Sequence, residues 1–134
     1  MKLGITGTRE GSNDIQLQAV IDFMKSIPLP AELHHGDCLG VDVEVATVAK
    51  ELGWRIVCHP PESDYLRGFY PSDEYRVPAG YLKRDRAIVD ECEFLMVVPL
   101  QNEWQKTGGT WYTHDYARKI NKPYKVFWPG EIHD

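Results

Sequence analysis

Short apolar segments alternate with helical patterns along this chain of 134 residues, and a loop follows each apolar segment. The most apolar segment, residues 93–99, has the core Phe-Leu-Met-Val-Val, which is typical of a central strand covered on both faces. The other strand-like segments are residues 2–6, 32–35, 54–59 and 124–128. Strands that alternate with helices favour right-handed crossovers and a parallel sheet. We therefore predict a single α/β domain over residues 1–134, a Rossmann-like three-layer sandwich with a mainly parallel five-stranded sheet.

The segments between these strands carry apolar residues at helical spacing. The first helix begins near Asn13 or Asp14, whose side chains can cap it, and ends before Pro28. Helical patterns also cover residues 41–52, 81–91 and 110–120. Residues 60–80 are too many for a simple connection and include several tyrosines. Long loops of this kind are usually functional or partly structured.

Composition excludes several classes of function. The formal net charge of −5 argues against a protein that mainly neutralises nucleic-acid phosphates, so nucleic acid is not an expected partner. The sequence has no apolar stretch of membrane-spanning length and no signal-peptide pattern at its start, so we expect a cytoplasmic protein with no membrane partner. Cys38, Cys58 and Cys92 form no Cys-x-x-Cys pair, and we expect them to be reduced and structural.

Glycine-bearing loops follow the predicted strands, and ligands of a doubly wound sheet bind beyond the carboxyl ends of its strands. Gly108, Gly109 and Thr110 precede a helix, where free backbone N–H groups and the helix dipole favour an anion. One interpretation is that these residues form a phosphate-binding loop. The other is that the glycines only form a turn and Thr110 only caps the helix.

A second glycine-bracketed turn contains Gly36, Asp37, Gly40 and Asp42. The carboxylate of Asp42 could accept ribose hydroxyls, or it could only cap backbone N–H groups. Charge for a phosphate could come from basic residues after the first strand and in the third helix, namely Arg9, Lys83, Arg84 and Arg86.

The histidines and carboxylates do not define a reaction. His34, His35 and His59 flank one edge of the sheet, but their spacing does not match a helical metal pair, so we expect no metal site and no cofactor. No Ser or Cys lies in a nucleophile-elbow sequence. Several carboxylates could lie in the crevice, but the sequence does not pair an acid with a base: Asp37, Asp42, Asp85 and Glu103.

Taken together, these motifs resemble the SLOG superfamily over nearly the whole chain. The residues that carry the resemblance are Gly7-Thr8-Arg9, His35-Gly36-Asp37, Gly40-Val41-Asp42, Arg84-Asp85 with Ile88-Val89, and Gly108-Gly109-Thr110. The resemblance implies a Rossmann-like fold and a site for nucleotides or nucleotide-derived molecules. Because small stand-alone members often self-associate, it also implies a homo-oligomer.

The superfamily includes DNA-processing proteins, ligand-sensing domains and Lonely Guy phosphoribohydrolases. Lonely Guy enzymes pair an Arg in the third helix with a Glu three residues after the Thr of their glycine-rich motif. Arg84 fits the first position, but Thr113 stands at the second, and Asp85 replaces the Asn that commonly follows the Arg. Whether the chain is an enzyme is left open, with Arg84, Asp85 and Asp42 as candidate catalytic residues for hydrolysis of a nucleoside 5′-monophosphate.

The function that the sequence favours is binding of a nucleotide-like small molecule, with its phosphate at the helix start of residues 108–110. Aromatic residues of segment 60–80 would cover the base. The candidate ligand-binding residues are Gly7, Thr8, Arg9, Gly36, Asp37, Gly40, Asp42, Arg84, Gly108, Gly109 and Thr110.

Overall fold

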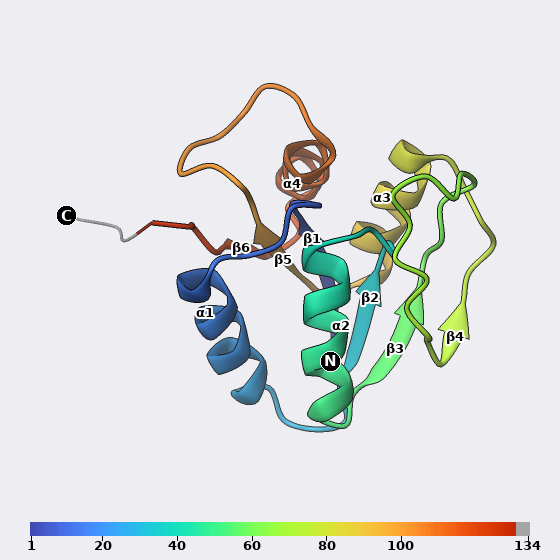
Figure 1. Ribbon diagram of the computed structural model, residues 1–134, viewed down its shortest axis with the longest axis vertical. Coiled ribbons are helices and arrows are strands. Elements are labelled where there is room, and N and C mark those ends of the chain that lie inside the picture. The colour runs from blue at the N-terminus through green and yellow to red at the C-terminus, as the bar shows by residue number, and fades with distance from the viewer. Residues whose placement is uncertain (131–134) are drawn as a thin grey trace.

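The computed structural model describes residues 1–130, in which a six-stranded sheet lies between two layers of helices (Figure 1). The elements are β1 (Lys2–Gly7), α1 (Asp14–Lys25), β2 (Glu32–His35), α2 (Val41–Glu51), β3 (Arg55–Cys58), β4 (Glu74–Tyr75), α3 (Tyr81–Glu91), β5 (Phe94–Val98), α4 (Gly109–Lys119) and β6 (Tyr124–Val126). The strand order is β4-β3-β2-β1-β5-β6, and every neighbouring pair is parallel. The predicted Rossmann-like α/β fold is confirmed.

The predicted strand number, five, is too low by one. The additional strand, β4, lies inside the long connection of residues 60–80 and pairs with β3 at Val57 and Cys58. The side chain of Asp73 helps to hold it there, because Asp73 Oδ2 accepts the N–H of Ile56 at 2.8 Å. Only two residues of β4 are in strand conformation, too few to produce an alternating apolar pattern in the sequence.

The start of α1 is defined by a reciprocal cap. Asn13 Oδ1 accepts the N–H of Gln16 at 2.9 Å, and Gln16 Oε1 accepts the N–H of Asn13 at 3.1 Å. This capping box satisfies two helix-end donors and fixes the beginning of α1 where the sequence predicts it. The helix ends at Lys25, before the prolines.

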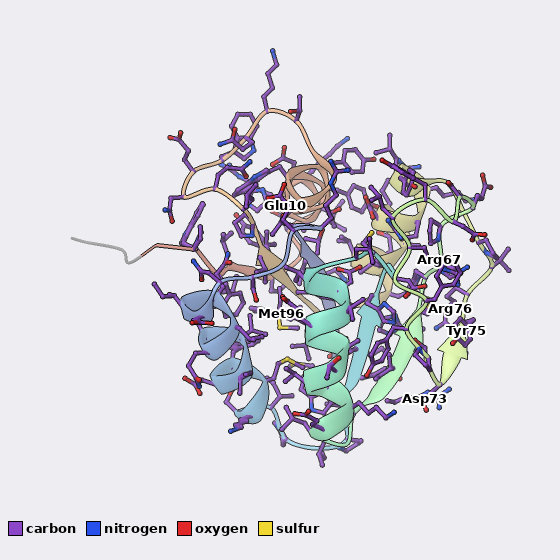
Figure 2. The ribbon with its side chains drawn as sticks, in the orientation of Figure 1. Glu10, Arg67, Asp73, Tyr75, Arg76 and Met96 are labelled. Carbon is purple, nitrogen blue, oxygen red and sulfur yellow. The ribbon has the colours of Figure 1, made fainter. Side chains whose placement is uncertain are left out.

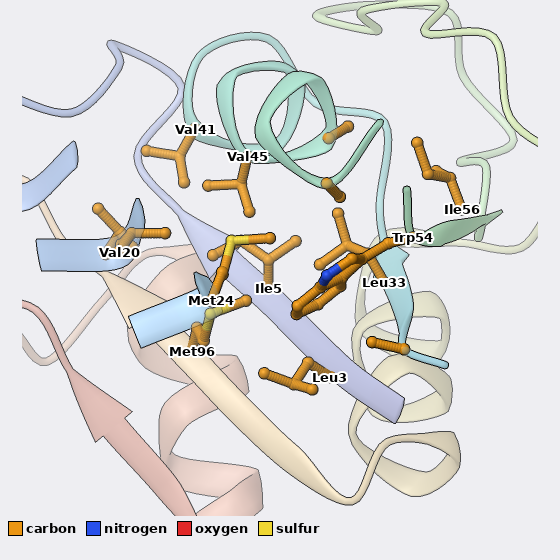
Figure 3. Close-up of a cluster of buried hydrophobic side chains, with 14 of the residues drawn as sticks. Leu3, Ile5, Val20, Met24, Leu33, Val41, Val45, Trp54, Ile56 and Met96 are labelled. Atoms are coloured by element: carbon orange, nitrogen blue, oxygen red, sulfur yellow. The ribbon is translucent and has the colours of Figure 1, made fainter. Parts of the chain in front are cut away.

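Each face of the sheet buries its own apolar cluster. On the face covered by α1 and α2, Ile5 and Met96 pack against residues such as Met24 and Val45 (Figure 3). On the opposite face, under α3 and α4, the cluster comprises Ile88, Val89, Cys92, Leu95, Val97 and Ala117. Alternate residues of β5 therefore enter opposite clusters, which confirms that β5 is a central strand covered on both sides.

The strand order places the carboxyl ends of β1, β2 and β5 side by side. From β1 the chain builds outward through β2, β3 and β4, and then returns to the other side of β1 as β5 and β6. The loops after β1 and β5 therefore separate at this reversal, which is where ligands of open α/β sheets bind. Within residues 1–130, no helix is both long and apolar enough to cross a membrane.

Candidate functional site

A cavity of about 660 Å³ opens at the carboxyl ends of β1, β2 and β5. Its volume lies in the range of small-molecule sites. Among the eleven predicted ligand-binding residues, those that line it are Gly7, Thr8, Arg9, Gly36, Asp42, Arg84, Gly108, Gly109 and Thr110. Asp37 and Gly40 lie outside the cavity wall. Three sequence-distant loops and the start of α3 therefore meet around one space.

The first turn of α4 forms one wall of this cavity. Gly108 has a φ of 104°, a conformation that favours glycine, and no side chain caps the helix. Because α4 begins at Gly109, Thr110 lies inside the first turn and is not the capping residue. The Oγ1 of Thr113, one turn later, donates to the carbonyl of Gly109 at 2.8 Å. The turn thus presents backbone N–H groups and the Thr110 hydroxyl at the cavity wall.

Arg9 supplies a cation at the mouth of the cavity. Its side chain is exposed and has no hydrogen bond or ion pair with the rest of residues 1–130. Glu10, labelled in Figure 2, follows it in the same loop and also lines the cavity. The N–H of Val41 donates to the Thr8 carbonyl at 3.1 Å and joins this loop to the start of α2. The approach requires glycine at residue 40, which has a φ of 83° and where a Cβ would come within 2.5 Å of the Arg9 carbonyl.

Arg84 is buried and already has protein partners. Its Nε donates to Asp85 Oδ1 at 2.8 Å, and its Nη1 donates to the carbonyl oxygens of Gly36 and, at 3.3 Å, His59. Its Nη2 lies 3.6 Å from Cys38 Sγ. Arg84 therefore fixes the ends of two strands while its charge lies at the cavity wall.

Two buried carboxyl groups line the same region. Asp42 Oδ2 accepts the N–H groups of Gly36 at 2.9 Å and Cys38 at 3.3 Å, which closes the turn after β2. Burial raises the pKa of Asp42 to about 6, against the opposing effect of Arg84. Burial also raises the pKa of Asp85, which is opposed by its ion pair with Arg84.

Asp37 anchors the long connection instead of lining the cavity. It is fully buried with a φ of 56°, and its carboxylate accepts Arg67 Nε at 2.7 Å and the N–H of Tyr70 at 2.8 Å. The N–H of Gly68 donates to the Asp37 carbonyl at 2.7 Å. These bonds fasten residues 67–70 to the turn after β2.

The cavity wall also has an apolar part that no sequence motif indicates. It includes Leu66, Tyr81, Leu82 and Trp111. Tyr65, from the aromatic segment that was expected to cover a base, also lines it, whereas Tyr70 and Tyr75 do not. The Tyr81 hydroxyl donates to the Tyr65 carbonyl at 3.2 Å, so α3 holds the long connection at this wall. Tyr81 and Leu82 are exposed residues of α3, and helical spacing alone could not distinguish them from ordinary surface residues.

Other candidates lie outside the cavity wall. Lys83 and Glu103 are exposed and do not line it, and Arg86 Nη1 donates to the Tyr112 hydroxyl at 2.7 Å. Thr113, at the position of the Lonely Guy glutamate, is buried and bonds to its own helix. The carboxylates at the wall are therefore Asp42, Asp85 and Glu10.

The fold is similar to those of several solved structures. DNA processing protein A from Streptococcus pneumoniae matches with a TM-score of 0.71 and 15% identity, over 99% of this chain and 52% of that chain. TM1055, a structural genomics target, matches with a TM-score of 0.63 and 17% identity, over 92% and 71%. DNA processing protein A from Helicobacter pylori, described for its single-stranded DNA binding mode, matches with a TM-score of 0.60 and 19% identity, over 94% and 64%. No family model and no curated protein matches the sequence.

These similarities show that the chain shares a Rossmann-like fold with DNA processing protein A and TM1055. This chain spans about half of the Streptococcus protein and less than two thirds of the Helicobacter protein, as the coverages of 52% and 64% show.

Proposed function

We propose that this SLOG-like domain binds a nucleotide or nucleotide-derived ligand, with a phosphate on the first turn of α4. The observation that carries the proposal is the uncapped helix start at Gly108 and Gly109, which opens into the cavity. A helix start of this kind binds anions through free N–H groups and the helix dipole. Arg9 is an exposed cation at the same cavity and has no hydrogen bond or ion pair within the described residues 1–130, so it supplies a second phosphate contact.

The other end of the ligand would contact the apolar part of the cavity wall. Tyr65, Tyr81 and Trp111 line the cavity together with polar residues of the β1 loop. Ligand sites of this class combine apolar walls with a few polar groups that set orientation. We therefore assign the base to the aromatic wall and the phosphate to residues 108–110.

Native mass spectrometry of the purified protein, followed by a nucleotide panel in isothermal titration calorimetry, tests this proposal. The panel should pair each nucleotide with its nucleoside, which has the same base and ribose but no phosphate. We expect a nucleotide to bind and its nucleoside to bind at least tenfold more weakly, because the phosphate contacts are lost. Absence of binding by every member would contradict the proposal.

Hydrolysis of the N-glycosidic bond of a nucleoside 5′-monophosphate is the second candidate function. It is favoured by Asp42 and Asp85, which line the cavity and whose pKa values are both raised by burial, to about 6 for Asp42. Carboxyl groups with raised pKa values are candidates for general acid–base catalysis. Arg84 would position Asp85 through their 2.8 Å ion pair. The wild type should release free base from a nucleoside 5′-monophosphate, whereas Asp85→Asn should release none. If the wild type releases no base from any nucleoside monophosphate tested, this candidate function is removed.

The resemblance also supports self-association, and the sequence supports a cytoplasmic location. Light scattering after size exclusion measures the mass of the particle in solution, and the mass of a single protomer at micromolar concentration would count against self-association.

A short single-stranded DNA oligomer added to the nucleotide titration distinguishes a polymer ligand from a free nucleotide. We expect the nucleotide to bind more tightly, because the chain carries a net charge of −5.

A further inference from the structure

Three side chains meet on the α3 face of the sheet, outside the cavity wall. His34 comes from β2, His59 directly follows β3, and Glu91 ends α3. His34 Nδ1 lies 2.8 Å from His59 Nε2, which lies 3.3 Å from Glu91 Oε2. These three atoms are all within 4.8 Å of one another. Both histidines are buried, whereas Glu91 is 36% exposed and connects the cluster to solvent.

Groups around this cluster orient His34 and Glu91. Glu32 Oε1 lies 2.6 Å from His34 Nε2, so in the neutral ring Nε2 carries the proton and Nδ1 has its lone pair toward His59. A histidine that ligates a metal commonly donates its other N–H to a carboxylate in this way. Arg76 Nε donates to Glu91 Oε1 at 2.9 Å, which leaves Glu91 Oε2 toward His59. Arg76 is labelled in Figure 2, beside Tyr75 at the β4 side of the molecule.

We propose that His34 Nδ1, His59 Nε2 and Glu91 Oε2 form a binding site for a divalent metal ion of the zinc class, with water as the fourth ligand. Two histidines and one glutamate are an established donor set for zinc. With metal–ligand bonds of about 2.0–2.1 Å, the ligand atoms of a tetrahedral site are about 3.3 Å apart. The 3.3 Å separation of His59 and Glu91 already fits this geometry. The 2.8 Å separation of the two histidine nitrogens needs to increase by about half an ångström.

The charge around the site also suits a cation. Glu32 and Glu91 contribute two carboxylates, while Arg76 contributes one positive charge through its bond to Glu91. Arg76 makes a second ion pair, to Glu74 at 2.8 Å, so its charge is shared with a further carboxylate. The sequence predicts no metal site, because the histidine spacing matches no helical pair. Parallel pairing of β2 with β3 instead brings His34 and His59 together across the sheet.

A neighbouring cluster of His35, Asp37 and Cys58 has similar donor atoms, but the ring nitrogens of His35 and the carboxylate of Asp37 already have hydrogen-bond partners. His35 Nδ1 accepts the N–H of Asp37 at 2.9 Å, and the Asp37 carboxylate is bonded to Arg67 and to the N–H of Tyr70. All three side chains are buried. We therefore assign the metal to the His34, His59 and Glu91 cluster alone.

Titration of the untagged full chain with Zn²⁺ by calorimetry, and with Co²⁺ by visible absorption, tests this site. The wild type should bind one equivalent, and bound Co²⁺ should give the intense visible bands of a four-coordinate ion. Glu91→Gln keeps the shape of a half-exposed side chain and should weaken binding at least tenfold. Glu51→Gln, at the exposed end of α2, is the control and should bind like the wild type. Absence of saturable binding, or equal affinity in Glu91→Gln, would overturn the proposal.

Two further variants guard against misassignment. His59→Gln should lose metal binding, and circular dichroism shows whether this variant folds. If His59→Gln does not fold, Glu91→Gln alone decides the result. Cys58→Ala should leave the affinity unchanged, because Cys58 belongs only to the neighbouring cluster. Loss of binding in Cys58→Ala but not in Glu91→Gln would assign the metal to that cluster and overturn the proposal. None of these outcomes depends on nucleotide binding.

Discussion

Arg84 packs directly over Gly36, to whose carbonyl its Nη1 donates, and a Cβ at Gly36 would lie 2.6 Å from that nitrogen. The absence of a side chain at residue 36 thus allows a buried arginine from α3 to hold the turn after β2. That turn contributes Gly36, Cys38 and Asp42 to the cavity wall. The shape of the cavity therefore depends on this contact.

Gly36→Ala should displace Arg84 and destabilise the domain. We expect a loss of about 1–3 kcal/mol in the free energy of unfolding, as for an added methyl group in a packed interior. Gly80→Ala is the control, because a Cβ at Gly80 has no neighbour within 4 Å. Urea unfolding of both variants measures the difference, and equal midpoints would show that the contact does not constrain the fold.

Arg9→Gln should weaken nucleotide binding without changing stability. Loss of one charge-assisted hydrogen bond costs about 1.5–3 kcal/mol, roughly 10- to 150-fold in affinity. The affinity for the corresponding nucleoside should not change. Calorimetry on Arg9→Gln and on Lys50→Gln, an exposed α2 control, makes the comparison. A similar loss for nucleoside and nucleotide would place Arg9 away from the phosphate.

Asp42 should make stability depend on pH. Its pKa rises from 3.8 to about 6 on folding, mainly because of burial, with Arg84 and Asp85 as neighbouring charges. The folded state therefore favours the protonated form, so this contribution is complete below pH 4 and is lost as pH rises through 6. Asp42→Asn keeps an oxygen for the N–H groups of Gly36 and Cys38 but cannot ionise.

Unfolding free energies at pH 4 and pH 7 test this prediction. The quantity to compare is the unfolding free energy of Asp42→Asn minus that of the wild type. This difference should be larger at pH 7 than at pH 4 by up to about 3 kcal/mol, because the two pKa values differ by about two units. Parallel pH profiles for the two proteins would mean that Asp42 does not titrate differently in the folded state.

Asp37→Ala should release the long connection from the sheet. Removing this carboxylate leaves Arg67 Nε and the N–H of Tyr70 without their partner, which costs about 1.5–3 kcal/mol, as for hydrogen bonds to a charged group. Asp64→Ala is the control, since Asp64 is exposed and lies 3.5 Å from Arg67 Nη1. Limited proteolysis should cut residues 60–80 faster in Asp37→Ala only. Equal cutting rates would contradict the anchoring role.

The sequence predicts those parts of this protein that depend on local pattern. The apolar run of β5, the polar residues that can cap α1 and the glycines before α4 each produce a signal within a few residues. A local pattern could not distinguish the role of Asp37 from that of Asp42, since both residues follow β2. Asp42 lines the cavity, whereas Asp37 turns to Arg67, thirty residues away in a segment without regular periodicity.

The same limit applies to Arg84 and to the histidines. Helical spacing places Arg84 in α3, but its bonds to the carbonyl oxygens of Gly36 and His59 depend on how α3 packs on the sheet. His34 and His59 are 25 residues apart, and only the parallel pairing of their strands brings the rings together. Contacts of this kind are set by tertiary packing and have no local signal.

Amide NMR of the ¹⁵N-labelled protein tests the proposed binding of a phosphate on the first turn of α4. On titration with the nucleotide that binds best, the amide resonances of Gly109 and Thr110 should shift strongly. The matching nucleoside should leave these two resonances near their free positions while it perturbs residues of the aromatic wall such as Tyr81. Binding of the nucleotide with no shift at Gly109 and Thr110 would contradict the assignment of the phosphate to this turn.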